Sequence, residues 1–274
     1  MPGTWPTVIL LVVATVCGTA CGQFRARTPG QYFDSAGVKI YYTDEGSGPP
    51  VILIHGLAAN ADANWRRPGT VDALTPHYRV ITLDLRGHGL SDKPHAVEAY
   101  GTQMCEDVVR LMDHLNLPRA HVVGYSLGGF ITLKLATLHP NRLLSIGVCG
   151  AGWDPPEASP TFNFLARRGE RGLEAGDDAE PGALAGRRND PEALAAVSAA
   201  SPALKVSEAE IRALTMPICV VAGDRDPERF AAQRLRDMAA HVTFTSIPGA
   251  GHIQAVARPE LRDALRGFLD RQPR

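Results

Sequence analysis

The stretch Gly124–Gly129, of sequence GYSLGG, decides how this chain folds. The run His121–Val123 before it is short and β-favouring, as a buried strand is expected to be. The run Phe130–His139 after it has apolar residues at helical spacing and stops at Pro140. The pattern therefore predicts a strand, a tight turn and a helix, with a serine at the turn.

A G-x-S-x-G sequence between a strand and a helix is typical of a nucleophile elbow, which lifts Ser126 out at the edge of a sheet. The flanking glycines leave room for a close approach of strand and helix that side chains would block. In a simpler interpretation Ser126 only caps the helix and the glycines only make a turn. The choice depends on whether partners for the serine follow in a suitable order.

A second strand supplies the first of these partners. Val51–Ile54 reads as a buried strand, and the loop after it contains His55 and Leu57. The main-chain N–H groups of Leu57 and Leu127 are candidates for an oxyanion hole. His55 ends a strand, so we expect it to support the loop that carries Leu57.

The acid and the base come later in the chain. Pro217–Ala222 is a predicted strand that is followed by Asp226, and Val242–Ile247 is a predicted strand that leads to His252. Serine, aspartate and histidine thus each follow the carboxyl end of a predicted strand. Open α/β sheets bind their ligands at that edge.

The chain resembles the α/β-hydrolase fold family from residue 32 to residue 272. The matching segments are His55-Gly56, Asp84–Ser91, Gly124–Gly129, Gly223–Asp226 and Gly249–His252. The resemblance implies an α/β fold with a mostly parallel, eight-stranded sheet flanked by helices. It also implies a division into a core of residues 22–152 and 215–274 with a cap insertion at 153–214.

The resemblance assigns roles to the site residues. Ser126 would be the nucleophile, His252 the base, and Asp226, at the end of a G-x-x-D turn, the acid that orients the imidazole. Asp224 is the alternative acid. The reaction implied is acyl transfer to water through an acyl-enzyme.

Several substrates stay open at this point. Dehalogenases and epoxide hydrolases of this fold carry aspartate at the elbow, so Ser126 argues against both. Esters, lactones, thioesters, amides and C–C bonds remain, with perhydrolysis as a side activity, and a carboxylic ester is the most permissive choice. A non-catalytic binding or receptor protein on the same scaffold is the alternative.

The predicted cap, residues 153–214, is rich in proline, glycine and charge, and only short helices such as Pro191–Ala200 can be drawn in it. We expect a small, mobile cap over an open cleft. Tyr125, Trp153 and Phe162 are candidate substrate-binding residues. Alternatively, the aromatic residues of the cap pin it to the core.

Composition narrows the class of protein. The 274 residues carry a net charge of −1, with a pI near 6.8, and give no electrostatic footprint for nucleic acid. No metal-binding pattern such as H-E-x-x-H occurs, and no cofactor is implied. A small-molecule, ester-like substrate is the expected partner.

The N-terminus predicts export. Val8–Val16 is apolar but shorter than the roughly 20 residues of a membrane span. With the small residues Gly18–Ala20 it fits a signal peptide that ends before Cys21. Cys21 resembles the lipidated cysteine of bacterial lipoproteins, so residues 1–21 form either a lipoprotein leader or a secretory one. An unprocessed tail is the alternative.

The remaining cysteines are expected to be small buried hydrophobes. Cys149 and Cys219 lie in apolar strand runs and Cys105 on a predicted helix. A disulfide between Cys149 and Cys219 stays open if the protein is exported.

Overall fold

The computed structural model describes residues 29–157, 159–171 and 189–272. The predicted leader, residues 1–21 with Cys21, lies outside the described residues and stays a prediction. Residues 172–188, in the middle of the predicted cap, also lie outside the described residues. Among the described residues, no helix combines the length and the apolar character needed to cross a membrane.

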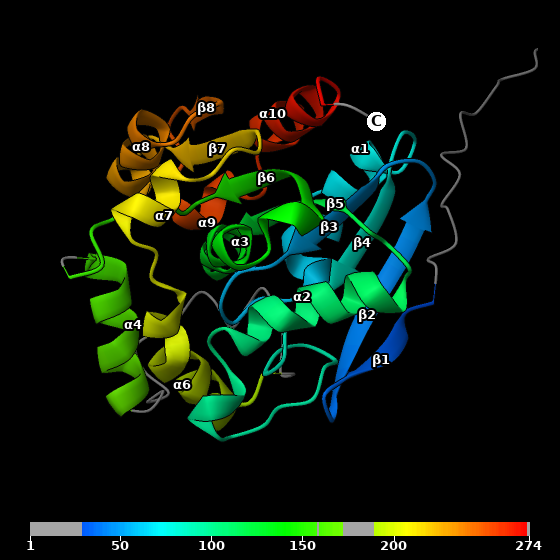
Figure 1. Ribbon diagram of the computed structural model, residues 1–274, viewed down its shortest axis with the longest axis vertical. Coiled ribbons are helices and arrows are strands. Elements are labelled where there is room, and N and C mark those ends of the chain that lie inside the picture. Colours follow the sequence, from blue (N-terminus) through cyan, green and yellow to red (C-terminus); the bar gives the residue numbers. More distant parts are fainter. Residues whose placement is uncertain (1–28, 158, 172–188, 273–274) are drawn as a thin grey trace, which may run out of the picture.

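One eight-stranded sheet forms the centre of the molecule (Figure 1). The strands run in the spatial order β1-β2-β4-β3-β5-β6-β7-β8. β2 is antiparallel to β1 and β4, and every other pair is parallel. The predicted α/β class with a mostly parallel sheet is therefore confirmed. The strands are β1 (Gln31–Ser35), β2 (Val38–Gly46), β3 (Pro50–Ile54), β4 (Arg79–Leu83), β5 (Ala120–Tyr125), β6 (Leu143–Cys149), β7 (Ile218–Gly223) and β8 (Val242–Ile247).

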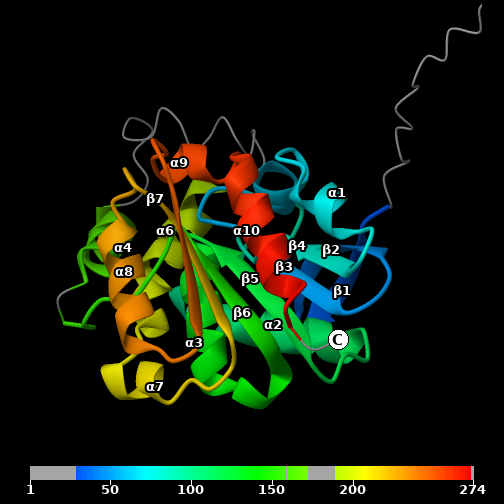
Figure 2. The same ribbon diagram turned by 90° about the horizontal axis from the view of Figure 1, so that it is seen from above.

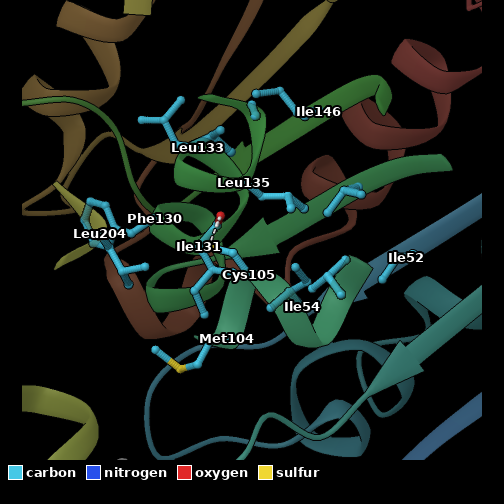
Figure 3. Close-up of a cluster of buried hydrophobic side chains, with 14 of the residues drawn as sticks. Ile52, Ile54, Met104, Cys105, Phe130, Ile131, Leu133, Leu135, Ile146 and Leu204 are labelled. Atoms are coloured by element: carbon cyan, nitrogen blue, oxygen red, sulfur yellow. Dashed lines mark hydrogen bonds between the residues drawn. The ribbon is translucent and has the colours of Figure 1, made fainter. Parts of the chain in front are cut away.

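Helices cover both faces of the sheet (Figure 2). One apolar layer joins the sheet to α2 (Gln103–His114), α3 (Leu127–Leu138) and α8 (Arg229–Met238). The other joins it to α1 (Thr70–Leu74) and α10 (Pro259–Leu269). Figure 3 shows how side chains of α2 and α3 meet those of β3 and β6 in the first layer. The strands β3 to β7 are packed on both faces, which explains why their sequences are mainly apolar, whereas the edge strand β8 is mostly half-buried.

The cap segment lies between β6 and β7. It contains α4 (Pro160–Arg171), α6 (Pro191–Ala200), the 3-10 helix η4 (Ser201–Leu204) and α7 (Glu208–Arg212). α4 is longer than the short pieces expected from sequence, because Phe162 and Leu165, one turn apart, supply a buried stripe despite the many charged neighbours. α4 and α6 pack side by side (Figure 1). The boundaries and mobility of the cap stay predictions.

Cys105, Cys149 and Cys219 are free and buried. In the β6–β7 register Cys149 pairs with Val221 and Cys219 with Gly147, so the two cysteines are offset along the strands. Burial raises the pKa of the Cys105 and Cys219 thiols to about 12 and that of Cys149 well above its ordinary value. The disulfide between Cys149 and Cys219 is absent, and all three behave as the small buried hydrophobes expected.

Candidate active site

Ser126 occupies the sharp turn between β5 and α3. Its φ of 54° and ψ of −118° lie in a region that residues other than glycine rarely adopt. The turn is held by hydrogen bonds from the Ser126 N–H to the Cys149 carbonyl (2.8 Å) and from the Gly129 N–H to the Ser126 carbonyl (2.8 Å). Strain of this kind persists only where the surrounding structure imposes it, as it does here.

The glycines of the turn allow β5, α3 and β3 to meet. A β-carbon on Gly124 would lie 1.9 Å from the Gly128 carbonyl oxygen, and one on Gly128 would lie 2.3 Å from the Ile54 carbonyl oxygen. Both contacts are with backbone, which cannot rotate away as a side chain can. The predicted reason for these glycines is thus confirmed.

Three side chains far apart in sequence meet at the carboxyl edge of the sheet. His252 Nε2 lies 2.9 Å from Ser126 Oγ, and His252 Nδ1 lies 3.0 Å from each carboxylate oxygen of Asp226. Asp226 follows β7, and His252 begins the short helix α9 (His252–Ala255) after β8. The structure therefore brings together the serine, histidine and aspartate that the sequence selected.

The alternative acid, Asp224, has a different place. Its side chain is exposed and accepts a hydrogen bond from the Gly249 N–H (2.8 Å), which ties the loop after β7 to the loop after β8. Asp226 is fully buried and also accepts from the Glu228 N–H (2.9 Å). The geometry places Asp226, not Asp224, against the imidazole.

The electrostatic environment of His252 favours its charged form. Burial lowers the pKa of His252, but the hydrogen bond from the ring to Asp226 and the negative charges of Asp226 and Glu228 outweigh it, and the net shift is upward from 6.5. Glu228 accepts a hydrogen bond from Thr161 of α4, while its other carboxylate oxygen is buried with no hydrogen-bond partner in the part of the chain that the structure describes. Burial raises the pKa of Glu228, the Thr161 hydrogen bond lowers it, and the nearby Asp226 charge raises it again, for a net upward shift.

The loop after β3 lies against the serine. A β-carbon on Gly56 would lie 3.1 Å from Ser126 Cβ. The Leu57 N–H lies in this loop and the Leu127 N–H at the N-terminus of α3, where the helix dipole favours negative charge. Neither group donates to an acceptor within residues 29–157, 159–171 and 189–272. Both predicted oxyanion donors are therefore free to bind a ligand.

His55 fixes the peptide that carries one of these donors. The Leu85 N–H donates to His55 Nε2 (3.0 Å), which leaves the proton on Nδ1 to donate to the Gly56 carbonyl (2.7 Å). Burial lowers the pKa of His55 to about 4, against the effect of that hydrogen bond, so the ring is neutral. Because the Gly56 carbonyl and the Leu57 N–H share one planar peptide, His55 orients the N–H as well. The predicted supporting role of His55 is confirmed.

The three candidate substrate-binding side chains are all buried by protein. The Tyr125 hydroxyl donates to the His252 carbonyl, and its ring packs against the His252 ring. Trp153 donates through Nε1 to the Val206 carbonyl (2.8 Å), and Phe162 packs on Phe130 with ring centroids 4.9 Å apart. Phe162 thus pins the cap to the core, as in the alternative interpretation. The main-chain N–H of Trp153 donates to the Ala231 carbonyl of α8 (3.0 Å) and ties the start of the cap to the core, and Tyr125 braces the histidine.

Sequence reasoning missed three polar residues around the site. Asn64, in the π-helix η1 (Asp62–Arg66), accepts from the Gly56 N–H (3.1 Å), and Asn189 of the cap donates to the Ala58 carbonyl (2.7 Å). Glu228 is the third. None of the three belongs to a motif that sequence reasoning could have recognised. Across the described residues, no group of three or more His, Cys, Asp or Glu side chains is arranged to hold a metal ion.

Comparison with known proteins defines the class. A sequence model of the alpha/beta hydrolase fold matches residues 49–168. The putative carbamate hydrolase RutD of Caulobacter vibrioides is 30% identical over 249 residues, which are 82% of this chain and 91% of that protein. The chain belongs to the α/β-hydrolase fold family. The predicted family is therefore confirmed, whereas the reaction and the bond that is cleaved stay proposals.

Two further similarities refine the picture. A dihydrolipoyllysine-residue acetyltransferase component of an acetoin cleaving system from Cupriavidus necator is 35% identical over 156 residues, 56% of this chain and 40% of that protein. The chain spans less than half the length of several curated relatives that it matches. A thermophilic esterase from Thermogutta terrifontis superposes with a TM-score of 0.71 at 25% identity, over 89% of this chain and 98% of that one.

Proposed function

We propose that this protein is a serine hydrolase that cleaves a carboxylic ester or lactone through an acyl-enzyme on Ser126. The observation that carries the proposal is the continuous contact from Ser126 Oγ through His252 to buried Asp226, at 2.9 and 3.0 Å. A serine hydroxyl needs an adjacent base to become nucleophilic, and these distances allow direct proton transfer.

The chemistry proceeds in two halves. His252 takes the proton of Ser126 as its oxygen attacks the substrate carbonyl, and then gives that proton to the leaving alcohol. Asp226 holds the imidazole and stabilises its charged form without taking the proton itself. The N–H groups of Leu57 and Leu127 bind the developing oxyanion. Water then attacks the acyl-enzyme by the same path and releases the acid.

The choice of an ester or a lactone is supported by two features. Ser126 supplies the oxygen nucleophile suited to acyl transfer, and the superposed Thermogutta protein is described as an esterase. A non-catalytic binder on the same scaffold would not need the strained turn at Ser126 or two N–H groups that donate to no acceptor among the described residues. C–C bond cleavage and perhydrolysis use the same residues and differ only in substrate.

Covalent labelling tests the proposal. A fluorophosphonate probe should label the wild-type protein and not the Ser126→Ala variant, and wild-type protein should hydrolyse 4-nitrophenyl acetate. Ser145→Ala removes a buried serine hydroxyl away from the elbow and serves as the matched control. Wild-type protein that neither takes up the probe nor turns over any activated ester would exclude this function.

We also propose that residues 1–21 direct export, with Cys21 as a candidate lipid attachment site. Support comes from the apolar run Val8–Val16 and the small residues after it. The intact mass of the mature protein from membrane and soluble fractions distinguishes a lipidated Cys21, a soluble chain beginning at Cys21, and an uncut chain. The uncut chain would contradict export.

A further inference from the structure

The loop that carries the Leu57 N–H is held at three points around that group. Asn64 accepts from the Gly56 N–H (3.1 Å), His55 donates to the Gly56 carbonyl (2.7 Å), and Asn189 donates to the Ala58 carbonyl (2.7 Å). The first two supports come from the core. The third comes from the cap segment, more than a hundred residues away in sequence.

Ala58 needs such a support. Its φ of 58° is left-handed, which an alanine adopts reluctantly because its β-carbon approaches the backbone. Ala58 is buried and its hydrogen bond to Asn189 is partly buried, so the Ala58 carbonyl has less access to water than a surface carbonyl if the amide is lost. Relaxation of Ala58 to an ordinary conformation would rotate the peptides of the loop, including the one that carries the Leu57 N–H.

Asn189 is well placed to act on the loop because its own backbone is anchored. The next residue, Asp190, caps α6 by accepting from the N–H groups of Glu192 (2.9 Å) and Ala193 (3.3 Å). The other carboxylate oxygen of Asp190 lies 2.9 Å from His95 Nε2, which fastens the start of α6 to the core. Asn189 therefore projects from a fixed helix start.

We propose that Asn189 is a positioning residue for the reaction: its side-chain amide holds Ala58 left-handed and thereby aims the Leu57 N–H at the oxyanion. The inference rests on the proposed serine hydrolase function. It gives the cap a part in forming the catalytic site, in addition to any part in admitting substrate.

Asn189→Asp is the sharpest test, because it keeps the shape of the side chain and removes the donor. With 4-nitrophenyl acetate we expect kcat to fall about 10-fold or more, less than the 10²–10³ lost when an oxyanion donor is removed outright, with KM within about twofold. The affinity for a boronic acid, which forms a tetrahedral adduct on the serine, should fall by a similar factor. Asn189→Ala also removes the donor and should lower kcat by a similar factor. It provides a second variant for the test if Asn189→Asp does not fold.

Two controls separate positioning from charge and from stability. Asn116→Asp makes the same chemical change at an exposed left-handed residue between α2 and β5, and should leave kcat unchanged. Ala58→Gly removes the need for support, since glycine adopts a positive φ freely. In that background Asn189→Asp should cost less than it does in the wild type, and a double-mutant cycle measures the difference.

The outcomes are distinct. Active wild-type protein with kcat unchanged in folded Asn189→Asp and Asn189→Ala would overturn the inference and leave the proposed function intact. A rise in KM alone would also overturn it, because it would mean that Asn189 contacts substrate. Unlabelled and inactive wild-type protein would overturn the function and the inference together.

Discussion

At the scale of single residues, Asp224 and Asp226 offer a direct comparison. They lie two positions apart in one loop, yet only Asp226 is buried and contacts His252. If Asp226 orients the imidazole, Asp226→Asn should lower kcat by about 10⁴, because an amide favours the wrong tautomer of the histidine. Asp224→Asn should keep kcat within a few fold. Steady-state kinetics on 4-nitrophenyl acetate measures both, and equal losses would contradict the assignment.

The pH profile follows from the charges around His252. The histidine acts as a base only when it is neutral, and its pKa lies above 6.5 because the hydrogen bond to Asp226 and the charges of Asp226 and Glu228 outweigh burial. The value of kcat/KM should therefore rise with pH and reach half its maximum above pH 6.5. Activity that is already maximal well below that pH would be inconsistent with this assignment.

Glu228→Gln should move the same half-maximum to lower pH, because it removes a negative charge that raises the pKa of His252. The glutamine can still accept the hydrogen bond from Thr161 of α4. Glu208→Gln, an exposed glutamate paired with Arg212 on α7, is the matched control and should leave the profile in place. An unshifted profile in Glu228→Gln would mean that Glu228 does not act on the base.

At the scale of elements, the tight contact between α3 and the end of β3 is the most sensitive point. Gly128→Ala would bring a β-carbon to 2.3 Å from the Ile54 carbonyl and 2.7 Å from the His55 carbonyl. We expect a loss of about 1–3 kcal/mol or more in the free energy of unfolding. Activity should fall as well, because the oxyanion loop starts at His55.

A second glycine makes a matched comparison for denaturant unfolding. Gly267 lies within α10, where an added β-carbon comes no nearer than 3.6 Å, to the flexible end of Arg271. Gly267→Ala should stabilise the protein by up to about 1 kcal/mol, the usual helix preference for alanine. If Gly128→Ala did not lower the free energy of unfolding either, the close packing at the elbow would not contribute to stability.

Helices and strands could be predicted from the sequence where the local pattern of apolar residues was clear. The β3 and β5 runs are buried on both faces and mainly apolar, which made them recognisable as strands. α4 was underestimated because its charges mask the Phe162 and Leu165 stripe. Asn189 and Glu228 could not be found, because their partners Ala58 and Thr161 are distant in sequence and belong to no motif.

At the scale of the whole molecule, the cap is joined to the core on both sides of Ser126. The Trp153 main chain contacts α8 and the Phe162 ring contacts α3. Thr161 reaches the acid side through Glu228, and Asn189 reaches the oxyanion side. The sequence indicated a cap here and, as one of two interpretations, that its aromatic residues pin it to the core, but it did not indicate the contacts of Thr161 and Asn189. Changes in the cap that never touch a substrate are therefore expected to alter turnover.

The three buried thiols allow unfolding of the protein to be measured by their reaction with a thiol reagent. A thiolate is the form that attacks disulfide reagents, and Cys105, Cys149 and Cys219 are both shielded and disfavoured as thiolates. In a variant with Cys17 and Cys21 replaced by serine, an aromatic disulfide such as Ellman's reagent should react only as fast as the chain unfolds. The rate of colour formation would then give the unfolding rate without any added label. A rapid initial burst of colour would contradict the burial of these thiols.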